Sequence, residues 1–441
     1  MRQSKRERAV LAGSCAAAML CSTMAAWGSQ PIRSPQVMHT GTAPTGYTVT
    51  FRYANPRATS VQIRGEWYFA RPGDLARIAA TPEHPAVQGQ GLLPAQWRPG
   101  DFPLQHPNST AGNWPVASMR KGKGGVWTYT VPLPSGTFNY EFLVDGSKAA
   151  PGEVYIPSDP AFDTVDYCWQ GPANRKGGLA LVTYPALDRG TSGHDNRLVI
   201  YTPPGYDATR DRPYPTLYLS HGGGENEMGW SLQGDVGNIL DNLIDRGELQ
   251  PIIVVMPNAA GLSNDDMNEA FDRDIIDNVI PYVEKHYHVS MSATARAFAG
   301  LSLGGMLTNS FIIKHPEVFR YYGMMSAGLP PENGTLTAAQ IAALRGKSIW
   351  IGGGWEDVIF AAGWNMGSIR IHTGPAREVS TFARAGIPVT TDFIHGGHEW
   401  YVWRILLKDF LTRVAFLPQP YAIWEQSAAA RVRGTSPAGH Q

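Results

Sequence analysis

The feature that most constrains the fold is an alternation between short apolar segments and longer amphipathic segments in the second half of the chain. The short segments have the length and composition of buried strands, at 198–202, 215–220, 252–256, 295–300, 321–326, 348–352 and 389–394. Helical patterns lie between or after them, at 236–246, 271–286, 304–314 and 399–411. Strands that alternate with helices in this way form a parallel sheet covered on both faces. The sequence therefore predicts an α/β domain over residues 196–417.

Residues 46–167 show a different pattern, because polar and apolar side chains alternate with the period of a half-buried strand. Residues 47–53 and 138–144 are clear examples, and the Asp-Gly pair after the second is a strong hairpin signal. Several short strands with turns between them predict a small all-β sandwich. A Pro-, Gly- and Gln-rich insertion at 70–114 is either a functional loop or a segment without fixed structure.

The beginning of the chain has the features of an export signal. Residues 2–8 are rich in Lys and Arg, residues 10–24 are apolar, and small residues follow at a position suited to cleavage. The apolar stretch is shorter than the roughly 20 residues of a transmembrane helix. We therefore expect a signal peptide at 1–28 and a secreted or periplasmic protein, with an uncleaved anchor as the alternative.

Three further segments are rich in Pro, Gly, Ser, Thr or Ala, which favours connections and tails over regular structure. We expect linkers at 29–45 and 168–195 and a flexible tail at 418–441. Of the three cysteines, only Cys168 lies outside the signal, so a disulfide within the mature chain is excluded. Stability must therefore come from apolar cores, for which a hydrophobic content of 43% is sufficient.

The balanced charge argues against two classes of partner. The 441 residues include 37 basic and 37 acidic side chains, so the formal net charge is zero. Proteins that bind nucleic acid or an anionic membrane surface usually carry a basic excess. We therefore expect neither nucleic acid nor, after signal cleavage, a membrane as partner. A neutral polymer or a small ester suits this surface better, and the oligomeric state is left open.

The central motif is Gly-Leu-Ser-Leu-Gly at 300–304, which lies between a predicted strand and a predicted helix. In this context the motif predicts a nucleophile elbow, a turn so tight that the positions flanking the serine must be small. The turn would lift the hydroxyl of Ser302 above the sheet edge. The N–H of Leu303, at the start of the helix, would point to the same place and stabilise an oxyanion. An ordinary glycine-rich turn is the alternative.

A serine hydroxyl needs a base that accepts its proton and an acid that orients the base. His398 follows the predicted strand at 389–394, and Asp357 follows the one at 348–352. Both therefore lie at carboxyl ends of strands, where open α/β sheets place their sites. We predict Ser302 as the nucleophile, His398 as the general base and Asp357 as the acid.

Other residues compete for these roles. Glu356 is the alternative acid, and His395 and His372 are alternative bases. Asp392 lies inside a predicted strand and is interpreted as structural. His395 and His398 together suggest a metal pair, but a catalytic zinc needs a third protein ligand and no companion is evident. We therefore predict that the protein holds no metal.

The second oxyanion donor is expected from the glycine-rich segment after the strand at 215–220. His221-Gly222-Gly223-Gly224 occupies the loop that supplies this donor in esterases, and glycine lets the backbone approach the substrate closely. We predict the N–H of Gly223, with Gly222 as the alternative. A phosphate-binding loop is the other interpretation, but no Lys-Ser or Lys-Thr pair follows.

Large side chains near these motifs are candidates for the substrate pocket, and an aromatic-lined slot would favour a feruloyl group over an acetyl group. The substrate-binding candidates are Trp230, Met306, Trp355 and Trp400, with Trp364 as a further one. Burial in a core is the alternative for each. The same alternatives, sugar stacking or burial, apply to three tryptophans of the all-β region, Trp67, Trp114 and Trp127.

The predicted catalytic domain resembles the esterase family that includes esterase D-like enzymes, feruloyl esterases and acetyl xylan esterases. The resemblance covers about residues 190–415 and rests on motifs at 198–206, 217–224, 254–258, 280–284, 299–305 and 396–400. It implies an α/β-hydrolase fold, two-step acyl transfer without a cofactor, and Asp357 rather than Glu356 as the acid. Leu303 departs from the commoner Met, which is tolerated because only its backbone acts.

Residues 136–146 and 157–160 resemble the immunoglobulin-like domain that precedes many carbohydrate-active hydrolases. Together the two resemblances imply a secreted serine esterase that removes feruloyl or acetyl groups from plant cell-wall xylan. The alternatives among enzymes are a general carboxylesterase acting on small esters, a peptidase and an acyltransferase. Outside enzymes, the alternative is a non-catalytic carbohydrate-binding protein with an inactive hydrolase fold.

Overall fold

The computed structural model describes residues 34–71, 92–103, 116–185, 196–260, 267–328, 334–355, 357, 365–366, 369–370 and 374–417. Several predictions fall outside these residues: the signal at 1–28, the tail at 418–441 and most of the insertion at 70–114. The same holds for four individual candidates, Trp114, Glu356, Trp364 and His372.

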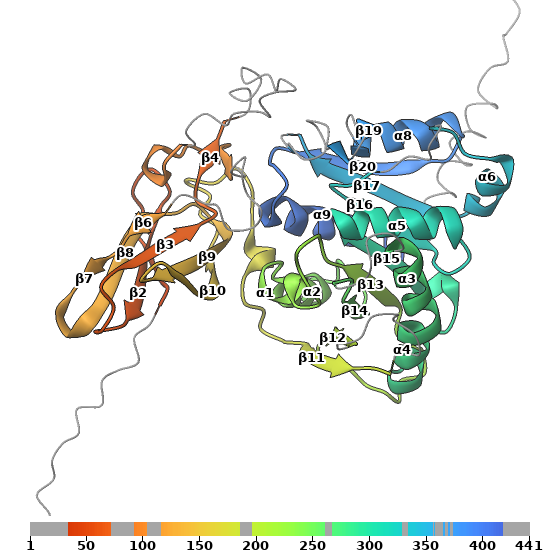
Figure 1. Ribbon diagram of the computed structural model, residues 1–441, viewed down its shortest axis with the longest axis horizontal. Coiled ribbons are helices and arrows are strands. Elements are labelled where there is room, and N and C mark those ends of the chain that lie inside the picture. Colours follow the sequence, from red (N-terminus) through yellow and green to blue (C-terminus); the bar gives the residue numbers. More distant parts are fainter. Residues whose placement is uncertain are drawn as a thin grey trace, which may run out of the picture. The chain divides into compact units, whose positions relative to one another are not determined.

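The N-terminal part of the described chain forms two four-stranded antiparallel sheets (Figure 1). The first has the order β1-β2-β8-β7, with β1 (Gln36–His39), β2 (Tyr47–Ala54), β8 (Val126–Pro132) and β7 (Arg120–Lys121). The second has the order β10-β9-β3-β6, with β10 (Ser147–Ile156), β9 (Gly136–Val144), β3 (Val61–Gly65) and β6 (Ala117–Ser118). Side chains of both sheets share one apolar core, as in a sandwich. This region is β-rich, as predicted, and its immunoglobulin-like classification stays a prediction.

Two tryptophans proposed for sugar stacking lie in the core of this sandwich. Trp67 is buried with its ring centre 5.3 Å from that of Phe51. Trp127 is also buried and donates its indole N–H to the carbonyl oxygen of Asn55 at 2.9 Å. Because their ring faces are covered, Trp67 and Trp127 stabilise the sandwich and do not stack on sugars.

An eight-stranded sheet forms the second part of the described chain (Figure 1). In spatial order its strands are β11 (Gly178–Thr183), β12 (Arg197–Thr202), β14 (Ile253–Pro257), β13 (Thr216–Ser220), β15 (Arg296–Leu301), β16 (Tyr321–Met325), β17 (Ser348–Gly354) and β20 (Val389–Ile394). The β11–β12 and β12–β14 pairs are antiparallel, and the remaining pairs are parallel. All residues of β13, β14 and β16 are buried, as expected for strands covered on both faces.

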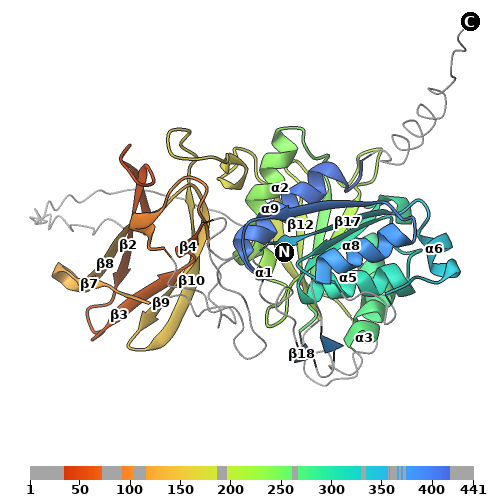
Figure 2. The ribbon, with the colours of Figure 1, turned by 90° about the horizontal axis from the view of Figure 1, so that it is seen from above.

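Helices cover both faces of this sheet (Figure 2). On one face, α2 (Val236–Asp245) and α9 (Trp400–Arg413) share a core with inward side chains of β13, β14 and β15. On the other face lie α3 (Met267–Asp274), α4 (Ile280–His286), α5 (Leu303–Lys314) and α8 (Gly374–Arg384). The prediction of an α/β domain with a mostly parallel sheet is therefore confirmed.

Shorter elements complete the described structure. The short helices are α1 (Gly229–Leu232), α6 (Ala338–Leu344), the 3₁₀ turns η2 (Pro94–Gln96), η3 (Lys123–Gly125), η4 (Cys168–Gln170) and η6 (Ala293–Ala295), and the π-helical turn η5 (Ile275–Val279). Two strand pairs stand apart, β4 (Phe69–Ala70) with β5 (Phe102–Pro103) and β18 (Asn365–Met366) with β19 (Ile369–Arg370). None of the helices within the described ranges is long and apolar enough to span a membrane.

Two segments that the composition predicted as linkers contain regular structure. Within 29–45, β1 pairs with β2, and within 168–195, η4 is followed by β11, which pairs with β12. Both strands lie at sheet edges and most of their residues are exposed. The linker predictions followed the Gly, Pro, Ser and Thr residues of these two segments, although β11 itself is mostly apolar (Gly-Leu-Ala-Leu-Val-Thr).

The helical predictions differ from the structure in two ways. The helix predicted at 271–286 begins at Met267 and is interrupted by η5, just before Pro281. Proline lacks the N–H of the regular helical hydrogen bond, which favours a local change of helix geometry. The prediction also missed α6 and α8. The start of α6 carried a signal, because Thr337 and Gln340 form a capping box.

Glu378 in α8 makes stability depend on pH. Its side chain is buried, and neither carboxylate oxygen has a hydrogen-bond partner among the described residues. Burial raises the pKa of Glu378 from 4.5 to about 8. Between these two values the folded chain holds a proton that the unfolded chain has released. The free energy of unfolding therefore falls as the pH rises through this window.

The substitution Glu378→Gln removes this titration. We expect the variant to exceed the wild type in free energy of unfolding by up to about 5 kcal/mol at pH 9 and to match it closely at pH 4. Urea unfolding at both pH values measures the difference. Glu269→Gln, at an exposed side chain of α3, is the control. The same pH dependence in wild type and Glu378→Gln would contradict the assignment.

Candidate active site

The turn between β15 and α5 forces Ser302 into a strained backbone conformation. Ser302 has φ of 50° and ψ of −114°, a region that residues other than glycine rarely adopt. Its N–H donates to the carbonyl oxygen of Met325 in β16 at 2.9 Å, and its own carbonyl oxygen accepts from the N–H of Met306 at 3.0 Å. These two hydrogen bonds hold the turn from both sides.

The glycines around Ser302 are required by close backbone contacts. A Cβ atom on Gly300 would lie 2.4 Å from the carbonyl carbon of Gly304, and one on Gly304 would lie 2.7 Å from the carbonyl oxygen of Ser220. Such distances are far below van der Waals contact, so any side chain would push the start of α5 away from β15 or β13. The spacing of the Gly-Leu-Ser-Leu-Gly motif thus follows from steric exclusion, which is the physical basis of a nucleophile elbow.

Two loops supply N–H groups near Ser302. Leu303 is the first residue of α5, so its N–H has no partner within the helix and lies at the positive end of the helix dipole. The glycine-rich loop after β13 lies beside the serine, because a Cβ atom on Gly222 would be 3.5 Å from the Cβ of Ser302. The N–H of Gly222 donates to the Glu225 carboxylate at 3.2 Å. Gly223 is exposed and surrounded by open space.

The predicted base and acid meet at the edge formed by β17 and β20. These strands pair in parallel, with Gly354 opposite Ile394, so the loops that follow them leave the sheet at the same edge. The Nδ1 atom of His398 lies 2.8 Å from Oδ2 of Asp357, and both side chains are buried. The ring of Trp403 packs edge-on against that of His398, with centres 4.9 Å apart. The hydrogen bond and this ring contact fix the orientation of the imidazole.

His395, the described alternative to His398 as the base, has other surroundings, and so has His221 of the glycine-rich loop. His395 is exposed, and its ring stacks on that of Phe102 with centres 5.4 Å apart. His221 is buried, with Nδ1 2.7 Å from the carbonyl oxygen of Gly222, while its Nε2 accepts the N–H of Ala259 at 2.9 Å. Burial lowers the pKa of His221, so a neutral imidazole braces the glycine-rich loop.

The structure corrects two of the four predicted substrate-binding residues. Trp230 and Trp400 are only 1% and 4% exposed, and their rings pack edge to face with centres 5.1 Å apart. They belong to the core between the sheet, α2 and α9, so they offer no ring face to a substrate. Met306 is partly accessible and Trp355 is 60% exposed, so these two stay candidates.

Sequence reasoning missed Glu225, which follows the glycine-rich loop. Its carboxylate accepts hydrogen bonds from Gly222 N–H, from the indole N–H of Trp400 at 3.1 Å and from the side-chain amide of Gln233 at 3.3 Å. Burial raises the pKa of Glu225. The only signal was an acidic residue directly after the glycines. Its contacts could not be foreseen, because Trp400 lies far along the chain.

Metal ligation finds no support in this part of the molecule. Among the residues that the structure describes, no group of three or more His, Cys, Asp or Glu side chains is arranged to hold a metal ion.

Residues 190–414, about half of the chain, match the model of a protein family described as "Putative esterase". The chain belongs to this family. The predicted family resemblance is thus confirmed, and the matched stretch includes Ser302, Asp357 and His398.

Two of the curated proteins to which part of this chain is similar are named as xylanases. An endo-1,4-beta-xylanase/feruloyl esterase from Xylanibacter ruminicola is 37% identical over 233 residues, which are 48% of this chain and 31% of that protein. Endo-1,4-beta-xylanase Y from Acetivibrio thermocellus is 31% identical over 204 residues, 44% of this chain and 17% of that protein. The chain therefore spans less than a third of the length of these relatives. Among solved structures, a ferulic acid esterase is 23% identical with a TM-score of 0.47, covering 55% of this chain and 99% of that one.

A methyl group on Gly300 tests the steric origin of the elbow. Because the added Cβ would overlap the backbone of Gly304, we expect Gly300→Ala to lower the free energy of unfolding by about 2–4 kcal/mol. Chemical unfolding of the purified variant measures the change. Gly223→Ala, where the added methyl meets open space, is the control for stability. Equal stability of both variants would show that the elbow has room for a side chain.

Proposed function

We propose that this esterase-family protein is a secreted serine carboxylic-ester hydrolase that removes feruloyl or acetyl groups from plant cell-wall xylan. The observation that carries the proposal is the hydrogen bond between His398 and Asp357 at one edge of the sheet that also bears the strained Ser302. A buried carboxylate on Nδ1 leaves Nε2 of the imidazole as the atom that can exchange protons with a nucleophile.

The proposed reaction proceeds in two steps. Nε2 of His398 takes the proton of Ser302 as Oγ attacks the ester carbonyl, and Asp357 stabilises the imidazolium that forms. His398 then returns the proton to the leaving alcohol, which departs as the tetrahedral intermediate collapses to an acyl-enzyme. Water, deprotonated by His398, attacks this acyl group, and the acid leaves with Ser302 restored. This chemistry uses only side chains and backbone of the protein, without a metal or an organic cofactor.

The oxyanion is assigned to the N–H groups of Leu303 and Gly223. Leu303 lies at the first position of α5, where the helix dipole adds to its hydrogen bond. We retain Gly223 over Gly222 because the N–H of Gly222 is already bound to Glu225. A single donor of this kind typically contributes about 3 kcal/mol to the stability of the transition state.

Support for the xylan ester comes from the names of the relatives and from the β-rich region. One relative is named an endo-1,4-beta-xylanase/feruloyl esterase. An immunoglobulin-like classification of the sandwich and export through the signal at 1–28 complete this proposal. Met306 and Trp355 are proposed to line the acyl site, since both are accessible. A general carboxylesterase acting on small esters is the alternative, and a non-catalytic carbohydrate-binding protein is the alternative outside enzymes.

Removal of the Ser302 hydroxyl distinguishes an enzyme from a non-catalytic carbohydrate-binding protein. The choice of substrate distinguishes a xylan esterase from a general carboxylesterase. We expect Ser302→Ala to lower kcat by at least about 10³-fold, because the acyl-enzyme cannot form. The assay compares release from methyl ferulate, acetylated xylan and p-nitrophenyl acetate. Ser380→Ala, on the exposed side of α8, is the control. Cleavage of p-nitrophenyl acetate alone would favour the general carboxylesterase. If the wild type cleaves none of the three, the enzymatic proposal fails.

Two histidines of one loop offer a matched test of the base. His398→Ala should reduce kcat by at least about 10³-fold, whereas His395→Ala should retain activity within about threefold, because its ring is exposed and lies on Phe102. Initial rates on methyl ferulate measure both. The assignment is wrong if the variant at 395 loses activity and the variant at 398 keeps it.

A further inference from the structure

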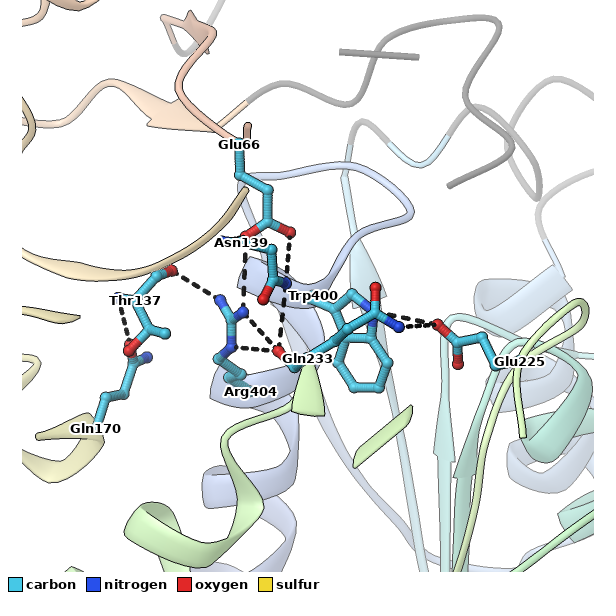
Figure 3. A network of polar contacts seen from close by, with 8 residues as sticks. All are labelled: Glu66, Thr137, Asn139, Gln170, Glu225, Gln233, Trp400 and Arg404. Carbon is cyan, nitrogen blue, oxygen red and sulfur yellow. Dashed lines mark hydrogen bonds and ion pairs between the residues drawn. The ribbon is translucent and has the colours of Figure 1, made fainter. Parts of the chain in front are cut away.

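Figure 3 shows a chain of polar contacts that runs from the glycine-rich loop to the β-sandwich. At one end, the Glu225 carboxylate holds Gly222, the residue beside Ser302, and also accepts from the indole of Trp400, which follows His398 by two residues. Glu225 thus joins the oxyanion loop to the beginning of α9. The Glu225 carboxylate also accepts a hydrogen bond from the side-chain amide of Gln233 at 3.3 Å.

Gln233 links this carboxylate to the next part of the network. While its side chain donates to Glu225, its backbone carbonyl oxygen accepts from two nitrogens of Arg404, Nε at 3.1 Å and Nη2 at 2.6 Å. The same oxygen accepts from the side-chain amide of Asn139 in β9 of the sandwich at 3.3 Å. One residue therefore contacts the active-site loop, α9 and the sandwich.

Arg404 depends on the sandwich for most of its remaining partners. Its side chain is 0% exposed, and its Nη1 donates to the carbonyl oxygen of Thr137 in β9 at 2.8 Å. The carboxylate of Glu66, which follows β3, lies 3.6 Å from its Nη2. Glu66 is itself held by the backbone and side-chain N–H groups of Asn139, at 2.8 and 3.2 Å. A buried guanidinium is stable only when such partners are present.

We propose that Glu225 and Arg404 are positioning residues through which the β-sandwich holds the oxyanion loop and the beginning of α9, and with it His398, in reactive geometry. The inference rests on the proposed esterase function and extends it. The sandwich is then part of the catalytic unit even for a small ester that never touches it.

The physical argument concerns how far each contact reaches. Loss of the Glu66 charge removes the carboxylate that lies 3.6 Å from Nη2 of Arg404. The guanidinium then shifts toward its remaining partners, which include the carbonyl oxygen of Gln233 and the more distant carboxylates of Glu153 and Asp235. Gln233 in turn determines where Glu225 lies, and Glu225 fixes Gly222 beside the nucleophile. A displacement of about 1 Å among reacting groups can lower a rate about 100-fold.

The test uses methyl ferulate, whose hydrolysis requires no polymer, and the full-length protein. We expect Glu225→Gln and Glu66→Gln each to lower kcat about 10- to 100-fold while KM changes less than about threefold. The double variant should lose less than the product of the two single effects, because both act along one path. Circular dichroism and the unfolding temperature establish that each variant is folded at the assay temperature.

Matched controls remove a buried or partly buried carboxylate outside this network. Glu227→Gln changes the same loop, but Glu227 pairs with Arg197 at 3.2 Å. Glu141→Gln changes the sandwich, where Glu141 pairs with Arg64. Both should keep kcat within about twofold of the wild type even if their unfolding temperature falls. If Glu66→Gln and Glu225→Gln lose stability as the controls do and keep kcat, the network only joins the two parts of the chain, and the proposal is overturned.

Gln233→Ala is the milder variant for the case that the charge changes prevent folding. It deletes the donor to Glu225 and leaves the backbone carbonyl for Arg404. We expect kcat to fall several-fold at unchanged unfolding temperature, and a kcat equal to that of the wild type would break the path and refute the proposal. Wild-type activity on methyl ferulate judges the esterase function separately. Without any such activity, both proposals fail together.

Discussion

The candidate active site depends on steric exclusion of side chains where the start of α5 meets the ends of β15 and β13. The start of α5 lies so close to β15 and β13 that Gly300 and Gly304 leave no space for a Cβ atom. Ser302 between them must therefore take a backbone conformation that is unfavourable for serine. The packing of the whole sheet maintains this strain, because β13, β15 and β16 are almost completely buried. A rigid, strained turn keeps the hydroxyl in one place relative to the loops of neighbouring strands.

Much of this arrangement could be predicted from local sequence. The predicted strands and helices of the α/β domain agree with the structure to within a few residues, because continuous apolar runs such as 252–256 identify strands that are buried on both faces. Strand order then places Asp357 and His398 at one edge, and their hydrogen bond accords with their predicted roles. Motif spacing was informative here because it reflects steric limits within a few residues.

What the sequence did not reveal depends on contacts between distant segments. Tryptophan is a common residue in substrate pockets, yet Trp230 and Trp400 pack on each other in a core although they are 170 residues apart in the sequence. The edge strands β1 and β11 lie in segments rich in Gly, Pro, Ser or Thr, and this hid them although β11 itself is mostly apolar. Glu225, Gln233 and Arg404 carry no motif at all. Their pairing becomes visible only when the sandwich and the α/β region are seen together.

The burial of Arg404 has a consequence for anyone who wishes to rearrange this chain. If the α/β region were produced without the sandwich, the guanidinium of Arg404 would lose Thr137 and Glu66. Mobile water molecules would then replace these fixed partners. Such a fragment would contain every motif of its family and still lack the Thr137 carbonyl and the Glu66 carboxylate that hold Arg404 of α9. Recombination with other modules should therefore keep the β-sandwich and the α/β region together and exchange them as one unit.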